Sequence, residues 1–67
     1  MKFEKGKLYT HRNMLDCIIH VLGPVYQDSE GYVLKVSWWV RAGYSLNMQE
    51  TISIKRSDLQ HWYEWKE

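Results

Sequence analysis

A chain of 67 residues has room for one domain with one small core, and its four Trp, five Tyr and one Phe argue against a disordered segment. Nine Lys and Arg against eight Asp and Glu give a net charge of +1, which removes the strongest electrostatic argument for a nucleic-acid partner. The single cysteine, Cys17, excludes an intrachain disulfide, and no apolar run reaches the length of a signal peptide or a membrane span. We therefore expect a cytoplasmic protein with no membrane partner.

The N-terminal third predicts a lead-in and two short strands. Residues 1–6 form the lead-in, with Phe3 as its large apolar side chain, and residues 7–13 alternate weakly, as an edge strand would. Residues 17–22 are rich in β-branched side chains, which favour strands. Their cleaner apolar parity is Cys17, Ile19 and Val21, so this face is expected to be buried.

A bend and a turn follow this second strand. Gly23-Pro24 interrupts it, because Pro cannot donate a hydrogen bond to the neighbouring strand, and pairing can resume at Val25 and Tyr26. Residues 27–31, reading QDSEG, are the clearest turn signal in the chain. They predict a hairpin that leads into the next strand.

Residues 32–41 have the most regular alternation in the sequence and predict the central strand. One parity is wholly apolar and consists of Tyr32, Leu34, Val36, Trp38 and Val40. The other parity mixes cations, a hydroxyl and apolar groups, and consists of Val33, Lys35, Ser37, Trp39 and Arg41. The first face should cover the core, and the second should keep the indole of Trp39 near water.

The C-terminal third predicts a loop, a strand and a helical turn. Residues 42–48 should connect to a strand at 49–56, with Ile52 and Ile54 facing inward. Ser57 and Asp58 precede Leu59 as a cap precedes a short helix, since both side chains accept hydrogen bonds from free N–H groups. Residues 61–65 fit either a closing strand or a continuation of that helix.

Together these elements predict an all-β fold, a five-stranded antiparallel barrel with a short helical turn near the C-terminus, spanning residues 1–67. The segments FEKGKLY, CIIHVL, DSEG, YVLKVSWW, ISIK and SDL, in this order, resemble the layout of Src-homology-3-like small barrels. That resemblance covers nearly the whole chain and implies a contact surface for peptides or nucleic acid. This superfold hosts many unrelated functions, so fold alone does not imply one of them.

A weaker similarity is to the plasmid-encoded type II dihydrofolate reductases, which have barrels of comparable size and strand order. Those enzymes place a Gln and a Tyr in the strand before the last turn. The present chain has Ser53 and Lys55 flanking Ile54 in that strand. The resemblance therefore implies nothing about catalysis.

Candidate catalytic and metal-ligating residues are few. Cys17 and His20 have a spacing that binds zinc on a turn or helix, but on a strand an offset of three places them on opposite faces. A nucleophilic Cys17 would need His11, His20 or His61 beside it, yet Cys17 is expected in the core. We expect no metal, no cofactor and no catalytic residue. An enzyme of this size would need a pocket between subunits.

The aromatic residues that lie among cations are the better candidates for function, because rings stack on bases and anchor protein interfaces. The expected binding residues are Lys35, Trp39, Arg41, Tyr44, Lys55, Trp62, Tyr63 and Trp65. An equally open alternative is that Trp39 is merely covered by a loop, the lead-in or a second subunit.

The function expected from this surface is protein binding without catalysis. One form of it is a small accessory or inhibitor protein of viral or mobile-element type that covers a partner's surface. The alternatives are nucleic-acid binding through the basic aromatic strand face and an oligomeric enzyme with a site between subunits. Self-association is compatible with the first and the last of these.

Overall fold

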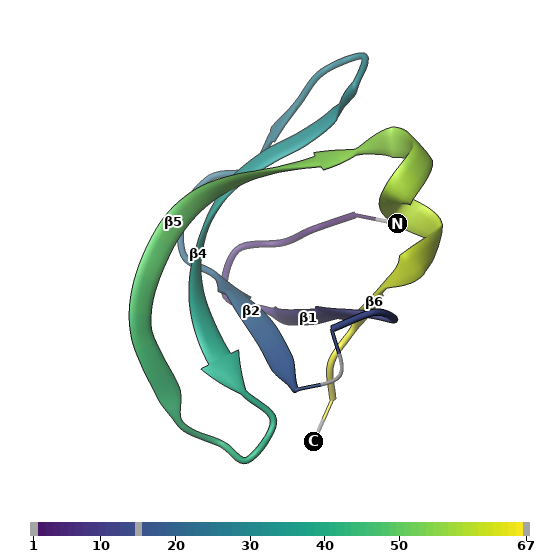
Figure 1. Ribbon diagram of the computed structural model, residues 1–67. Coiled ribbons are helices and arrows are strands. Elements are labelled where there is room, and N and C mark those ends of the chain that lie inside the picture. Colours follow the sequence, from purple (N-terminus) through teal and green to yellow (C-terminus); the bar gives the residue numbers. More distant parts are fainter. Residues whose placement is uncertain (1, 15, 67) are drawn as a thin grey trace.

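The computed structural model describes residues 2–14 and 16–66 (Figure 1). Within these ranges the chain forms one antiparallel sheet of six strands and no long helix, which confirms the all-β class. The elements are β1 (Leu8–His11), β2 (Cys17–Val21), β3 (Tyr26–Gln27), β4 (Gly31–Val40), β5 (Ser45–Lys55), the 3-10 helix η1 (Arg56–His61) and β6 (Trp62–Glu64). The described chain contains no helix with the length and hydropathy of a transmembrane span.

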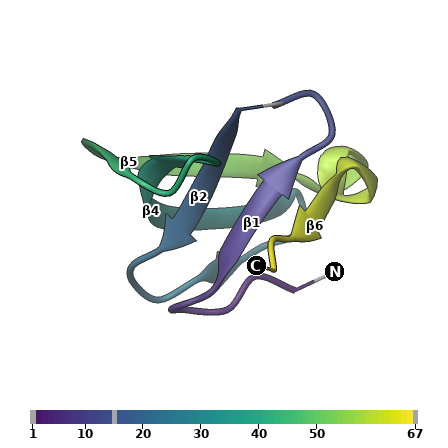
Figure 2. The ribbon, with the colours of Figure 1, turned by 90° about the horizontal axis from the view of Figure 1, so that it is seen from below.

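The long strand β4 lies at the centre of the sheet. β5 pairs with one side of β4, while β2 pairs with the C-terminal half of its other side and β3 with the N-terminal half. β1 then pairs with β2, and β6 pairs with β1. Figure 2 shows β1 between β2 and β6. The prediction that residues 7–13 form an edge strand was therefore wrong, because β6 returns from the far end of the chain to cover that edge.

The sheet curls strongly but is not closed among the described residues. Within the described ranges β3, β5 and β6 each pair with one other strand only, and η1 connects β5 to β6 (Figure 1). The prediction of a closed barrel with five strands is not confirmed. Residues 22–25, which include Pro24, separate β2 from β3, and this break adds the sixth strand.

The alternation of β4 positions the core as the sequence predicts. Tyr32, Leu34 and Val36 are buried, whereas Lys35 on the opposite face is exposed. The core cluster draws on the lead-in and on four strands, and consists of Phe3, Tyr9, Ile19, Val21, Tyr32, Leu34, Val36 and Ile54. Phe3 makes edge-to-face ring contacts with Tyr9 and Tyr32, at centroid distances of 4.7 and 5.4 Å.

The QDSEG turn joins β3 to β4 as predicted, and Asp28 organises it. The Oδ1 atom of Asp28 accepts hydrogen bonds from the backbone N–H groups of Glu30 (2.8 Å) and Gly31 (3.0 Å). Gly31 has φ of +151°, and a Cβ atom at this position would lie 2.0 Å from the carbonyl oxygen of Ile54. Only glycine fits this close approach of β4 to β5.

The connection between β4 and β5 is shorter than the predicted loop at 42–48, because β5 already begins at Ser45. Trp39 faces Ser45, whereas Ser37 faces Gln49, so three residues of β5 lie opposite one residue of β4. Asn47, with φ of +56°, lies in this bulge. Period counting missed the start of β5 because a bulge breaks the alternation of side chains.

Two predictions for the C-terminal segment are now decided. The helical turn is present as η1, but Lys55 is the residue before it and makes no side-chain capping bond, so the predicted cap at Ser57 and Asp58 was wrong. Asp58 lies inside η1 and accepts a hydrogen bond from the indole Nε1 of Trp62 (3.1 Å). Of the two alternatives for residues 61–65, the strand is correct, since β6 pairs with β1.

Candidate binding groove

The outer face of β1 and β2, opposite the core, is also covered. Thr10 and Ile18 point to this face, yet their exposed fractions are only 0% and 4%. Ile18 lies directly across from Trp39 in the pairing of β2 with β4. Both faces of these two strands are therefore covered, and the outer face forms the floor of a groove.

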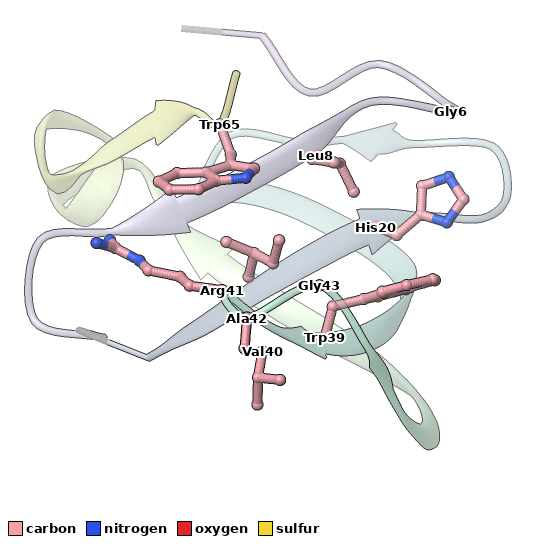
Figure 3. Close-up of a pocket in the computed structure, with 10 residues that line it drawn as sticks. Gly6, Leu8, His20, Trp39, Val40, Arg41, Ala42, Gly43 and Trp65 are labelled. Atoms are coloured by element: carbon pink, nitrogen blue, oxygen red, sulfur yellow. The ribbon is translucent and has the colours of Figure 1, made fainter. Parts of the chain in front are cut away.

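This groove has a volume of about 590 Å³ and is open to solvent (Figure 3). It is lined by Gly6, Leu8, Ile18, His20, Trp39, Val40, Arg41, Ala42, Gly43 and Trp65. Figure 3 shows Trp39 and His20 on one side of it and Arg41 and Trp65 on the other, with Leu8 between the two pairs. The groove thus has two indole walls around an aliphatic floor.

The Trp39 wall is oriented by its own strand. Its indole Nε1 donates a hydrogen bond to the Oγ of Ser37, two residues earlier on the same face of β4, at 3.1 Å. Ser37 is buried and Trp39 is partly buried. Because the polar edge of the indole is satisfied within the protein, the remaining ring surface can contact a ligand without leaving a donor unpaired.

The Trp65 wall is positioned by the β1–β6 ladder. The backbone N–H of Trp65 donates to the carbonyl oxygen of Leu8 at 2.9 Å, which continues the strand pairing one residue beyond β6. The indole consequently lies beside Leu8 on the outer face. This segment is one for which the sequence left helix and strand open, so only the pairing determined which face Trp65 occupies.

Arg41 is held in place by four residues, which belong to β1, to β6 and the residue after it, and to the segment before β2. Its Nη2 donates to the hydroxyl oxygen of Tyr63 (3.1 Å) and, at 3.4 Å, to the Oγ1 of Thr10. Its Cζ lies 4.9 Å from the centroid of the Trp65 ring, a cation–π arrangement. Its backbone N–H donates to the carbonyl oxygen of Asp16 at 3.0 Å. The guanidinium is therefore fixed at the edge of the groove.

The groove carries positive charge without a carboxylate among its lining residues. Arg41 is its permanent cation, and His20 is its other titratable group. Lys7 belongs to the same stretch of chain but forms ion pairs with Glu4 (3.1 Å) and Glu64 (3.7 Å). The hydrogen bond to Glu4 is the main reason that the pKa of Lys7 is raised. These two carboxylates are thus engaged outside the groove.

No family model, curated protein or solved structure matches this chain. The functional argument therefore rests on the geometry of the groove and of the surrounding strands.

The groove brings together three of the eight sequence-predicted binding residues, Trp39, Arg41 and Trp65. Tyr63 lies outside the groove, and its hydroxyl oxygen accepts a hydrogen bond from Arg41. Trp62 packs instead against the core, with its ring centroid 5.8 Å from that of Phe3.

The other three predicted residues lie elsewhere. Lys35 lines a separate depression with Gly23 and Pro24. Lys55 pairs across from Gly31 at the far end of β5, and Tyr44 is exposed in the turn before β5.

Sequence reasoning did not single out Leu8 or Ile18, and it weighed His20 only as a zinc ligand or as a base for Cys17. The available signal was the run CIIHVL, which is apolar on both parities except at His20 and so is typical of a strand covered on both faces. Period counting assigns one face to the core and leaves the second without a role. The segments that cover the second face, around Arg41 and Trp65, are distant in sequence.

The remaining polar clusters do not form a recognisable ligand set. Among the described residues no three His, Cys, Asp or Glu side chains gather closely enough to hold a metal ion. Cys17 is a free, partly buried thiol that lies outside the core cluster, so the prediction that it belongs to the core was wrong. The His11, Asp58 and Trp62 side chains form a hydrogen-bonded group that joins β1 to η1.

Proposed function

We propose that this chain is a non-enzymatic protein-binding module, and that the groove between Trp39 and Trp65 receives a segment of its partner. The observation that carries the proposal is the fixed placement of two indoles and one guanidinium around an aliphatic floor. Aromatic rings and arginines are the side chains that contribute most to protein interfaces, and an aromatic ring presents a large surface with few rotatable bonds.

The finer fold assignment belongs to the same proposal. The small size, the curled antiparallel sheet and the single helical turn before the last strand support a Src-homology-3-like barrel. In this proposal the protein acts in the cytoplasm as an accessory or inhibitor protein that covers part of a larger partner.

Site-specific photocrosslinking tests the proposed surface. A photoreactive phenylalanine analogue at Ala42, which lines the groove, should crosslink to a discrete protein in lysate of the native host. The same analogue at Tyr26, which is 67% exposed but does not line the groove, is the control position. The crosslink at position 42 should disappear in a Trp39→Ala background and persist in a Tyr44→Ala background. Equal crosslinking from positions 42 and 26 would refute the assignment of the groove.

Nucleic-acid binding is the second candidate, and the same two indoles favour it, since bases stack on aromatic side chains. It makes a different prediction about salt. Phosphate contacts release counterions, so retention on single-stranded DNA or heparin would fall steeply as salt rises. A protein interface built on aromatic contacts predicts little retention on either matrix at about 0.15 M salt. At that salt concentration the Debye length is about 8 Å, so attraction between more distant exposed charges is largely screened.

A further inference from the structure

The chemistry of the groove restricts what kind of segment can occupy it. A ligand that fills the space between the indoles of Trp39 and Trp65 must be apolar where it contacts Leu8 and Ile18. At the Arg41 edge it meets a cation, with no carboxylate among the lining residues. Opposite charge at that edge would be stabilised, and a second cation would be repelled.

Arg41 is suited to bind a carboxylate because its position is set before the ligand arrives. The hydrogen bonds that the structure describes for its side chain both use Nη2, and Nε is buried without a partner among the described residues, so the two N–H groups of Nη1 are the donors that remain for a ligand. Tyr63 and Trp65 hold the group in one orientation, so little side-chain entropy remains to be lost on binding. A carboxylate can therefore accept a charge-assisted hydrogen bond from Nη1.

The number of cations decides between an acidic peptide and a nucleic acid. Arg41 is the one arginine or lysine among the residues that line the groove, and both Lys35 and Lys55 line other depressions. A strand of nucleic acid presents a phosphate at every nucleotide, and its affinity rests on neutralising several of them. One cation beside an apolar surface fits a ligand with one charge and one bulky apolar group.

We infer that the groove binds an acidic peptide segment, in which an Asp or Glu pairs with Arg41 and a neighbouring bulky apolar side chain lies between Trp39 and Trp65. This inference rests on the proposed function, because it names the partner of the same groove. The occupant is a short stretch of a protein chain that carries a carboxylate beside an aliphatic or aromatic residue.

The test starts from a phage-displayed library of random dodecapeptides, selected on the full chain. Each enriched sequence is then synthesised twice, once as selected and once with its Asp and Glu replaced by Asn and Gln. Dissociation constants are measured by titration calorimetry for the wild-type chain, for Arg41→Gln and for Lys55→Gln. The last variant removes the same charge at a site away from the groove.

The acidic peptides should bind the wild type and Lys55→Gln about tenfold more tightly than their amide twins, as expected for one charge-assisted hydrogen-bonded pair. On Arg41→Gln the two peptides of a pair should differ by less than about twofold. Selected peptides without an acidic residue would overturn the inference while leaving the groove as a binding site. An equal loss of affinity in all three proteins, when Asp and Glu of the peptide are replaced by Asn and Gln, would do the same. The same titrations are made on Trp39→Ala, and selected peptides that bind this variant as tightly as the wild type would refute the proposed function as well.

A second measurement covers the case in which Arg41→Gln does not fold, as judged by circular dichroism. On the wild-type chain, the logarithm of the affinity of the acidic peptide should fall with the logarithm of the salt concentration, and that of its amide twin should stay flat, because screening acts on the charged pair alone. Parallel salt dependences for the two peptides would contradict a pairing with Arg41.

Discussion

The imidazole Nε2 of His11 lies 3.1 Å from the carboxylate Oδ1 of Asp58, although 47 positions separate them in the chain. The other ring nitrogen of His11, Nδ1, accepts a hydrogen bond from the backbone N–H of Asn13 at 3.0 Å. The ring therefore carries its hydrogen on Nε2 and donates it to Asp58. Because the indole of Trp62 donates to the same carboxylate, Asp58 fastens η1 to both β1 and β6.

Replacing Asp58 with Ala should destabilise the fold by about 1 to 3 kcal/mol, because the buried donor of His11 and the indole N–H of Trp62 both lose their acceptor. The free energy of unfolding is measured by urea titration followed by tryptophan fluorescence. Ser57→Ala, an exposed substitution in the same helix, is the matched control and should change it by less than about 0.5 kcal/mol. Equal effects of the two substitutions would show that the carboxylate does not fasten η1.

The same contact predicts a loss of stability in acid. The hydrogen bond from His11, followed by that from Trp62, lowers the pKa of Asp58 below its ordinary value of 3.8. A carboxyl whose pKa is lower in the folded state stabilises the fold fully above its unfolded-state pKa and ceases to do so as the pH falls through its folded-state pKa. The stability difference between wild type and Asp58→Asn should thus shrink below about pH 4. Urea titrations at several pH values measure it, and a constant difference would contradict this account.

Gly31→Ala should destabilise the fold by about 2 to 4 kcal/mol, from backbone strain and from the clash of the new Cβ with β5. The methyl group would start 2.0 Å from the carbonyl oxygen of Ile54 at a φ of +151°. Gly23→Ala is the control, since its Cβ would lie 4.0 Å from the nearest atom, the Cβ of Lys35, and its change should stay within about 1 kcal/mol. Urea titration of both variants measures the difference in unfolding free energy. Similar stabilities of the two variants would be inconsistent with the close approach of β4 to β5 at Gly31.

Tyr63→Phe should weaken groove binding about three- to tenfold with little effect on folding. The hydroxyl accepts a hydrogen bond from Arg41 at 3.1 Å, so its removal leaves the guanidinium less firmly oriented toward a ligand. The side chain is 41% exposed, and the change in unfolding free energy should remain below about 1 kcal/mol. Titration with an acidic peptide selected on the wild type measures the binding. Tyr44→Phe should bind like the wild type, and an equal loss there would argue against orientation by Tyr63.

Local patterns were enough to place most of the strands. The alternation of residues 32–41 predicted β4 and its buried face, and the β-branched run at 17–22 predicted β2. The turn chemistry of Asp28 predicted the β3–β4 hairpin. These features depend on backbone preferences and on side chains a few positions apart, which is why a single sequence contains them.

The site was only partly accessible from the sequence, for a reason that Arg41 illustrates. The alternation of residues 32–41 predicted that Arg41 lies on the same face as Trp39 and Lys35. That it is clamped by Tyr63 and stacked on Trp65 could not be predicted, because these residues belong to β6 and the segment after it. Asp58 shows the same limit, since a side chain typical of a helix cap serves here as the acceptor for a distant histidine.

The sequence by itself determined that β2 and β4 are extended, where β3 turns into β4 and which face of β4 is apolar, because those properties follow from neighbouring residues. Only the tertiary structure decided that β1 is an inner strand, that the outer face of β2 is covered and that two indoles flank one guanidinium. Packing and electrostatic interactions depend on distance in space, and the return of β6 to β1 is what brings Trp65 to Arg41.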